Sequence, residues 1–197
     1  MDEQTVKDAP RLKFVDGELT GLRPVLEGDL EALVHLLNES PLPFGDNIPW
    51  TVARLKKKYE DEKKPGLWDE EQRWYAVMKL ADNTLCGILR ETHWRTGEYG
   101  LKLHIADSNP RRCELMSDAL RTYVRFKDGF ANASRINIDF LDIETEKEAC
   151  LTEVGFIPQG RIPGVCFHLG ERRDYIVYSW IPQWVLDRRA PDGGAAT

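Results

Sequence analysis

Hydrophobic and polar positions repeat with two different periods along this chain, and the periods indicate where helices and strands form. Residues 19–25 alternate as a half-buried strand does. Residues 30–39 repeat apolar positions at helical spacing after Asp29, which suits a helix start. A second, strongly charged helix with one apolar stripe is expected over residues 51–63. The segment 40–49 between these helices is rich in proline, so we expect a loop.

The middle of the chain predicts a sheet. Three strand patterns follow one another with short turns between them, at residues 74–79, 84–91 and 99–105. These strands should therefore run antiparallel. Apolar positions after residue 110 recur at helical spacing, and the next strand pattern covers residues 135–141. Because a crossover helix makes the strands that it joins parallel, we expect an α/β (α+β) fold with a mixed, mostly antiparallel sheet and flanking helices.

Length and composition fit one globular domain. The chain has 197 residues, of which 42% are hydrophobic and 30% charged, and it has no apolar run long enough to span a bilayer. We expect a single domain over residues 12–185, between polar tails at 1–11 and 186–197 that we expect to be disordered. The polar, acidic start is not typical of a secretory signal, so a cytoplasmic protein that does not bind membranes is expected.

The net charge and the cysteines argue against several classes of function. A net charge of −6 argues against general nucleic-acid binding, which needs clustered basic residues. The four cysteines are far apart in the sequence, with no C-x-x-C motif and no histidine at ligand spacing. This pattern indicates neither a metal site nor a disulfide framework, and we expect buried free thiols.

The stretch 97–126 combines a strand, a polar loop at residues 106–110 and the start of a helix. A helix N-terminus offers amide N–H groups without partners inside the helix and a partial positive charge, so phosphate groups bind there. Arg111 and Arg112 add positive charge at this point. The stretch therefore predicts a seat for a phosphate-bearing acyl donor.

Together with its flanks, over roughly residues 12–182, this stretch resembles the GNAT acyltransferase superfamily, and within it the ribosomal-protein-type N-acetyltransferases and their small-molecule relatives. The segments occur in the family's order, and Gly155 and Phe156 precede a hairpin with Gly160 and Arg161, as in the family. The resemblance implies the GNAT fold, in which two parallel strands splay apart and hold the acyl thioester. It also implies transfer of an acyl group, most simply acetyl from acetyl-CoA, to a primary amine of a small molecule or a protein N-terminus.

The chain departs from the family's motifs at the expected donor site. The family's phosphate loop has glycine or alanine where this chain, aligned on Arg111, has Glu114 and Met116. Both side chains would crowd a pyrophosphate and Glu114 would also repel it, so the loop is degenerate. The family's asparagine and tyrosine before Gly155 correspond to Glu144 and Leu151, and leucine cannot protonate a leaving thiolate.

The resemblance assigns the donor site to the end of the central strand and the first turn of the following helix. A backbone amide of that strand would stabilise the oxyanion of the reaction. The expected donor-binding residues are Leu103, Ile105, Ala106, Arg111, Arg112, Cys113, Glu114, Leu115 and Met116. Alternative proton donors, for some of which strand or core packing is a sufficient explanation, are Tyr99, Tyr123, Tyr175, Tyr178 and Cys150.

The general base has three candidates. His104 alternates out of phase with Leu103 and Ile105, so its ring should face the opposite side of the sheet, near the splay. It is the first choice, and the alternative is a structural histidine under a helix. Glu91 and Glu98 flank a turn, where exposed carboxylates without a function are common.

The acceptor site is expected beside the two N-terminal helices, which form a mobile wall in the family. Phe44 lies in the loop between the helices, and Trp50 and Tyr59 lie at the start and within the second one. Trp50 and Tyr59 either line the acceptor pocket or anchor this helix to the domain. His93 lies in the turn before the central strand, where it can line the pocket or face solvent.

Two classes of function stay open. The first is an acyltransferase that uses acetyl-CoA and a small-molecule or peptide amine. The second is a protein that kept the scaffold but lost CoA, and that uses another acyl carrier, performs a different reaction or only binds a ligand. An aminoacyl-tRNA or a carrier protein would be such a carrier, and a charged tRNA is the one nucleic-acid partner that we expect. We expect a monomer or a homodimer.

Overall fold

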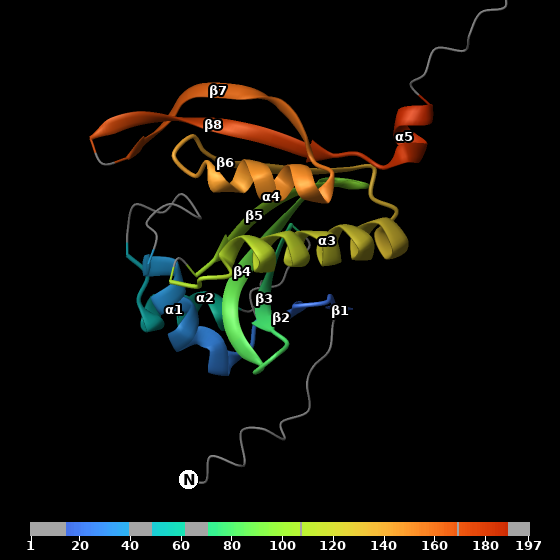
Figure 1. Ribbon diagram of the computed structural model, residues 1–197. Helices are drawn as coiled ribbons and strands as arrows, with labels where there is room; N and C mark the ends of the chain where they lie inside the picture. Colours follow the sequence, from blue (N-terminus) through green and yellow to red (C-terminus); the bar gives the residue numbers. More distant parts are fainter. Residues whose placement is uncertain (1–14, 40–48, 62–70, 107, 169, 189–197) are drawn as a thin grey trace, which may run out of the picture.

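The computed structural model describes residues 15–39, 49–61, 71–106, 108–168 and 170–188. Its strands form one sheet with helices on both faces (Figure 1). In chain order the elements are β1 (Val15–Asp16), β2 (Thr20–Pro24), the short 3₁₀ helix η1 (Glu27–Asp29), α1 (Leu30–Glu39), α2 (Val52–Tyr59), β3 (Gln72–Lys79), β4 (Thr84–Arg95), β5 (Glu98–Ile105), α3 (Arg112–Ala131), β6 (Arg135–Leu141), α4 (Glu146–Val154), β7 (Ile157–His168), β8 (Glu171–Trp180) and α5 (Gln183–Asp187).

The sheet has eight strands in the order β1-β2-β3-β4-β5-β6-β8-β7. Neighbouring strands are antiparallel except β5 and β6, which are parallel and are joined by α3. The predicted mixed, mostly antiparallel sheet is therefore confirmed. One boundary was wrong: His93 was expected in a turn but lies in β4, because the antiparallel pairing continues to His93 opposite Tyr99 and on to Arg95.

The parallel strands β5 and β6 separate at their C-terminal ends. Their pairing stops at Leu101 and Ile138, whereas β5 continues to Ile105 and β6 to Leu141. We call this region, beyond the last pair, the splay. The splayed parallel pair that the resemblance implied is confirmed.

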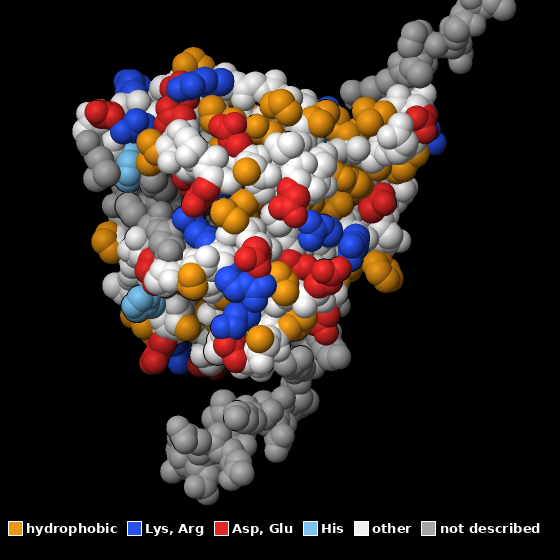
Figure 2. Space-filling view, in the orientation of Figure 1, with side chains coloured by type: hydrophobic (Ala, Val, Ile, Leu, Met, Phe, Trp, Pro, Cys, Tyr) orange, Lys and Arg blue, Asp and Glu red, His pale blue; other side chains and the backbone are white. Residues whose placement is uncertain are grey.

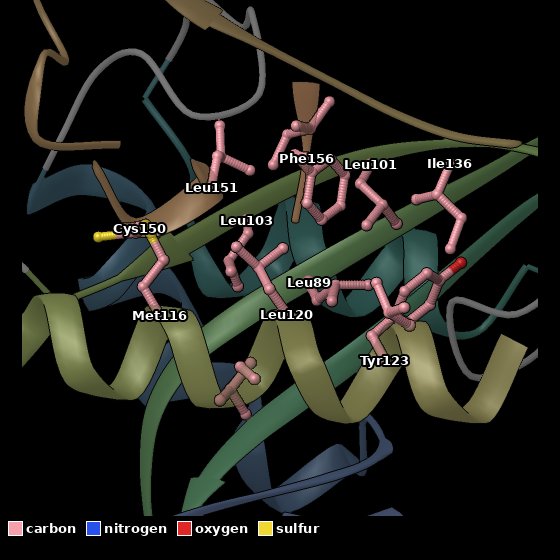
Figure 3. Packing of buried hydrophobic residues seen from close by; sticks show 14 of the residues in the cluster. Leu89, Leu101, Leu103, Met116, Leu120, Tyr123, Ile136, Cys150, Leu151 and Phe156 are labelled. Carbon is pink, nitrogen blue, oxygen red and sulfur yellow. The ribbon is translucent and has the colours of Figure 1, made fainter. Parts of the chain in front are cut away.

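Two hydrophobic clusters lie on opposite faces of the sheet. On one face α3 and α4 lie side by side and cover Leu101, Leu103 and Ile105 (Figures 1 and 3). On the other face α1 and α2 pack against a cluster that includes Trp74 and Ile88. Because neighbouring residues of a strand point to opposite faces, β3 and β4 contribute to both clusters.

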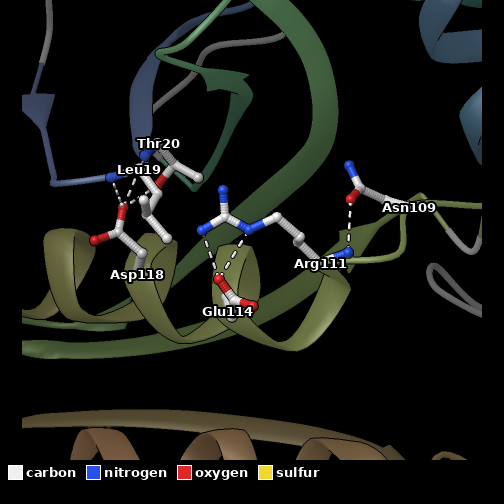
Figure 4. A network of polar contacts seen from close by, with 6 residues as sticks. All are labelled: Leu19, Thr20, Asn109, Arg111, Glu114 and Asp118. Atoms are coloured by element: carbon white, nitrogen blue, oxygen red, sulfur yellow. Dashed lines mark hydrogen bonds and ion pairs between the residues drawn. The ribbon is translucent and has the colours of Figure 1, made fainter.

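A buried carboxylate fixes α3 against the start of β2. Asp118 accepts hydrogen bonds from the backbone N–H groups of Glu18, Leu19 and Thr20 and from the Thr20 hydroxyl, at 2.7–3.1 Å (Figure 4). Burial opposes ionisation of Asp118, but these hydrogen bonds hold its pKa below the usual value. Gly17 must be glycine here, because an added Cβ would lie 2.2 Å from the Thr122 hydroxyl oxygen.

Two expectations concern the ends of the chain and membranes. The expected tail 1–11 lies outside the described residues, and so does most of the expected tail 186–197. α5 extends to Asp187, two residues into that second segment. Among the described helices, none combines the length and the apolar character needed to cross a bilayer.

Candidate active site

The first turn of α3 lies at the end of the loop that follows β5. Arg111 precedes the helix, and its backbone N–H donates to the side-chain oxygen of Asn109 at 3.0 Å. A cavity of about 270 Å³ lies beside this turn, lined by residues 109–114 and by Glu146 of α4. We call this cavity the phosphate seat. The Arg112 amide donates to the Asn109 carbonyl at 3.1 Å, whereas the amides of Cys113 and Glu114 have no carbonyl four residues back within the helix and can receive an anion.

Both arginines of the phosphate seat are paired with carboxylates. Arg111 donates to Glu114 at 2.5 and 2.8 Å (Figure 4), and Arg112 forms an ion pair with Glu146 across the space between α3 and α4. Acidic and basic side chains are interspersed over this face of the molecule (Figure 2). The charged side chains that line the seat therefore sum to zero. The exposed Arg111–Glu114 pair is worth about 1 kcal/mol or less, so an incoming phosphate can displace Glu114 from Arg111.

The two positions that differ from the family's glycine loop behave differently. Met116 is 2% exposed and points into the core, near Cys150 and Leu151 (Figure 3), so it does not crowd the phosphate seat from solvent as we expected. Glu114 is exposed and turns towards Arg111. The helical period explains this, because the side of α3 that carries Leu115 and Met116 faces the sheet.

A larger cavity lies on the other side of the loop that follows β5. It has a volume of about 800 Å³ and lies between this loop and the turn that joins β3 and β4. Ala106, Arg111 and Leu115 line it, so these expected donor-site residues border this cavity.

Within the splay, the backbone of β5 faces the gap. The N–H of Ala106 donates to Cys86 of β4 at 2.9 Å. Because successive residues of a strand direct their backbone groups to opposite edges, those of Leu103 and Ile105 point towards β6. Pairing with β6 has already ended at Leu101. These two amides are therefore placed to bind a group that enters between the strands.

His104 lies in the splay on the opposite face from Leu103, as its alternation predicted, and is fully buried. It lies close enough to Glu144, between β6 and α4, to act on its charge. Burial opposes ionisation of Glu144, but Lys147 at 2.5 Å, the hydrogen bond from the Leu141 amide and His104 together hold its pKa below the usual value.

A lysine and an aspartate connect the two separated strands. Lys102 of β5 forms an ion pair with Asp139 of β6, donates to the Asp139 carbonyl at 3.2 Å and lies 4.5 Å from the ring centre of Tyr175. Burial lowers the pKa of Lys102, with Asp139 opposing this and the nearby charges of Lys147 and Arg90 adding to it.

We call Lys102, His104, Asp139, Glu144, Lys147 and Tyr175 the splay cluster. Sequence reasoning missed its lysines and carboxylates as a group. The sequence did contain a signal: two neighbouring strands each carry a charged residue between apolar ones near their C-terminal ends, Lys102 in one and Asp139 in the other.

Comparisons with known proteins were made for the sequence and for the structure. No protein-family model matches the sequence, and no curated protein matches it either. The structure is similar to spermidine N-acetyltransferase from Vibrio cholerae in complex with CoA and spermine, at a TM-score of 0.72 and 16% identity over 85% of this chain and 98% of the other. It is also similar to a GNAT-family acetyltransferase from Bacillus anthracis, at 0.69 and 14% over 85% and 98%. A dodecameric structure of the Vibrio cholerae enzyme gives 0.66 and 18% over 87% and 98%.

This chain has the GNAT fold. The likeness covers nearly the whole of each related chain and, at this level of identity, concerns the fold alone. In the GNAT fold of this chain, the splay lies between α3 and α4 on one face and α1 and α2 on the other.

Glu91 was expected at the end of a strand beside a turn, and the structure corrects this. It is fully buried within β4, where its carboxylate accepts hydrogen bonds from Tyr75 at 3.0 Å and Tyr123 at 2.9 Å and pairs with Lys127 at 2.8 Å. Lys127 also lies 4.2 Å from the ring centre of Tyr99. This network joins β3, β4 and the C-terminal half of α3, far from the phosphate seat at the other end of that helix. Glu91 therefore lies in a network that holds β3, β4 and α3 together and not in the splay.

Glu98 and His93 lie at the other end of β5 from the splay. Glu98 begins the strand and lies 3.5 Å from Arg95, about 20 Å along the strand from His104. His93 is exposed and stacks on Tyr99 at 5.3 Å between ring centres. Neither residue joins the splay cluster, because the turn at residues 96–97 lies at the opposite edge of the GNAT fold from the C-terminal end of β5.

Of the expected acceptor-site residues, Trp50 is 7% exposed and packs edge-on against Trp74 at 6.1 Å. Asn38 holds its backbone through two hydrogen bonds of 2.9 Å. Tyr59 packs partly buried against the same cluster. These contacts favour the alternative that both aromatics anchor α2. Phe44 lies outside the described residues.

Proposed function

We propose that this protein is an N-acyltransferase that moves an acyl group, most simply acetyl from acetyl-CoA, to a primary amine of a small molecule or a protein N-terminus. The observation that carries the proposal is the splay, where β5 and β6 part beyond Leu101 and Ile138 next to the first turn of α3. The Vibrio cholerae enzyme of the same fold, which was solved with CoA and spermine, supports the donor and the class of acceptor.

The donor would bind from the side of α3 and α4. Its phosphates would lie in the phosphate seat, where Arg111 and Arg112 exchange their carboxylate partners for phosphate oxygens and the first-turn amides of α3 donate hydrogen bonds. Its thioester arm would extend into the splay. There the backbone groups of Leu103 and Ile105 take the place of a pairing strand and provide an N–H for the oxyanion.

The acceptor amine would approach from the α1 and α2 side of the splay cluster. Asp139 and Glu144 compensate the charges of Lys102 and Lys147, so the amine needs a base to remove its proton. His104 is the general base that takes this proton. The neutral amine then attacks the thioester carbonyl, and the C–S bond breaks when the tetrahedral intermediate collapses.

The leaving thiolate needs a proton, and Leu151 cannot supply one. Leu151 is fully buried in the core between α3 and α4. Tyr175 of the splay cluster is the best-placed hydroxyl, since its ring contacts Lys102 across the opening. Burial raises the pKa of Tyr175, and the nearby Asp139 charge adds to this effect, so the phenol keeps its proton until the thiolate forms.

Binding of acetyl-CoA tests the donor part of this proposal. A ligand present at ten times its dissociation constant stabilises the folded protein by about 1.4 kcal/mol, which thermal unfolding detects. R112Q should abolish this shift, whereas R95Q, which alters an exposed arginine at the far end of β5, should keep it. Release of free thiol from acetyl-CoA, with spermidine, single amino acids and short peptides as acceptors, tests the reaction. Absence of both stabilisation and thiol release at millimolar acetyl-CoA would contradict the proposal.

A second candidate function is supported by the carboxylates at the seat. Glu114 and Glu146 compensate the arginines that would otherwise attract a pyrophosphate, and Leu151 replaces the usual proton donor. In this case another acyl carrier, such as an aminoacyl-tRNA or an acylated carrier protein, would replace CoA. Acyl transfer from one of these carriers without stabilisation by acetyl-CoA would favour this second candidate.

A further inference from the structure

Two of the four cysteines meet between α3 and α4, although 36 residues separate them in the sequence. Cys113 lies in the first turn of α3, is exposed and lines the phosphate seat. Cys150 lies in α4 and is buried. The expectation of buried thiols is therefore confirmed for Cys86 and Cys150 but wrong for the exposed Cys113 and the partly exposed Cys166.

The contacts between the helices place these two thiols opposite each other. Arg112, adjacent to Cys113, pairs with Glu146, which is one helical turn before Cys150. One turn after Cys113, Ser117 donates to Glu153 at 2.9 Å. Two interhelix contacts thus bracket the cysteines.

The thiols also interact directly. The Cys113 side chain lies close enough to Cys150 to act on its pKa, and Cys150 donates to the backbone carbonyl of Glu146 at 3.4 Å. Burial, followed by the interaction with Cys113, raises the pKa of Cys150 to about 11. The buried thiol is therefore a poor nucleophile towards solvent oxidants, and the exposed Cys113 is the one that reacts first.

We propose that Cys113 and Cys150 are a reversible oxidative modification site, which forms a disulfide between α3 and α4 at the rim of the phosphate seat. Hydrogen peroxide oxidises the Cys113 thiol to a sulfenic acid and is reduced to water. The Cys150 thiol then attacks the sulfenic sulfur, the S–O bond breaks and a second water leaves. Overall, two thiols and one peroxide give one disulfide and two waters, and a dithiol reductant reverses the change.

The disulfide would close the phosphate seat. A sulfur–sulfur bond is only about 2.05 Å long, so it draws the first turn of α3 towards α4. Arg112 would then be held against Glu146, and the cavity that Cys113 lines would narrow. This consequence depends on the proposed function, because it matters only if a donor enters at this seat. The disulfide itself does not depend on it.

The test oxidises the full-length protein with one equivalent of hydrogen peroxide and maps its peptides without reduction. We expect a Cys113–Cys150 linked peptide that disappears with dithiothreitol and is absent from C113S. The matched control is C166S, which removes a partly exposed cysteine on β7 and should still form the link. A reduced Cys113, a Cys113 oxidised only beyond the sulfenic acid, or a link to another cysteine would overturn the proposal.

A second measurement separates this proposal from the proposed function. The affinity for acetyl-CoA, followed by thermal shift, should fall by at least about tenfold when the wild type is oxidised. Oxidised C113S should bind acetyl-CoA as reduced C113S does, whatever the affinity of that variant is. Unchanged affinity in a protein that carries the mapped link would overturn the closure of the seat. If the reduced protein does not bind acetyl-CoA at all, the donor assignment fails, while the peptide map still decides on the disulfide.

Discussion

Replacement of Glu91 by glutamine would remove one charge from a buried network and leave its shape almost unchanged. The glutamine side chain keeps an oxygen that can accept from the Tyr75 and Tyr123 hydroxyls. Lys127, which is 1% exposed and lies 2.8 Å from the Glu91 carboxylate, loses its counter-charge. Arg73 also lies 3.5 Å from the Glu91 carboxylate but is 34% exposed to water, so the main effect of the variant is a buried ammonium group without its anionic partner.

The magnitude follows from the burial of both groups. Removal of one partner of a buried ion pair costs about 3–5 kcal/mol, because the other charge is left in a poorly polarisable surrounding. In a domain of this size, this corresponds to a fall in melting temperature of roughly 6–20 °C. Burial already lowers the pKa of Lys127, and loss of Glu91 would lower it further. The difference in unfolding free energy between wild type and E91Q should therefore shrink as the pH rises towards the unfolded-state pKa of lysine, about 10.4, because Lys127 loses its charge.

Urea unfolding followed by circular dichroism measures these differences. K127M and the double variant E91Q/K127M complete a cycle, in which the double variant should be more stable than the sum of the single effects predicts by at least about 1 kcal/mol. E98Q is the matched control, since its exposed pair with Arg95 should change stability by less than about 0.5 kcal/mol.

Two results would refute this reasoning. The first is a loss of less than about 1 kcal/mol in E91Q, which would mean that Lys127 finds water or another acceptor. The second is strict additivity in the cycle. The same variant also tests the role of Glu91 in catalysis: at a temperature where E91Q is folded, acyl transfer per folded molecule should be unchanged, whereas a loss of turnover would return Glu91 to the candidates for the general base.

Three further outcomes are expected. H104Q should lower turnover about a hundredfold while stabilisation by acetyl-CoA stays the same, and a normal rate would move the general base to Asp139 or another group of the splay cluster. D118A should destabilise the protein by about 3 kcal/mol at neutral pH, because it leaves the amides at residues 18–20 without their acceptor. The folded-state pKa of Asp118 is depressed, so this stabilisation is complete above the unfolded-state pKa of about 3.9 and is lost as the pH falls through the folded-state pKa. If the wild type remained more stable than D118A below the folded-state pKa, the assignment would be wrong. E146Q should tighten acetyl-CoA binding by releasing Arg112, with E114Q as the comparison at the more exposed pair, and unchanged affinity in both would place the phosphates elsewhere.

Much of the fold could be predicted from local patterns. The strand at residues 135–141 was predicted to the residue, and the helix before it makes β5 and β6 parallel in any compact arrangement. The alternation of polar and apolar residues around His104 correctly predicted the face of the sheet on which its ring lies. These predictions succeed because the hydrophobic period of a strand or a helix depends only on residues that are close in the sequence.

The candidate site was predicted less well. Glu91 and Glu98 were candidates as acidic side chains at the end of one strand and the start of the next, but a position at a strand end does not say at which edge of the sheet that end lies. Glu91 proved to be buried because α3 crosses it and brings Lys127 against it, 36 residues further along the chain. Trp50 was expected either to line an acceptor pocket or to anchor its helix, and only its packing against Trp74 favours the anchor.

The sequence by itself determined the order of helices and strands, the single parallel pair and the face of the sheet to which each strand residue points. Only the tertiary structure decided which charges and thiols meet: Lys102 with Asp139 across the splay, Arg112 with Glu146 and Cys113 with Cys150 between α3 and α4. The physical reason is one of range. Periodicity is a property of adjacent residues, whereas these contacts depend on strand register and on how two helices pack, which the whole core sets together.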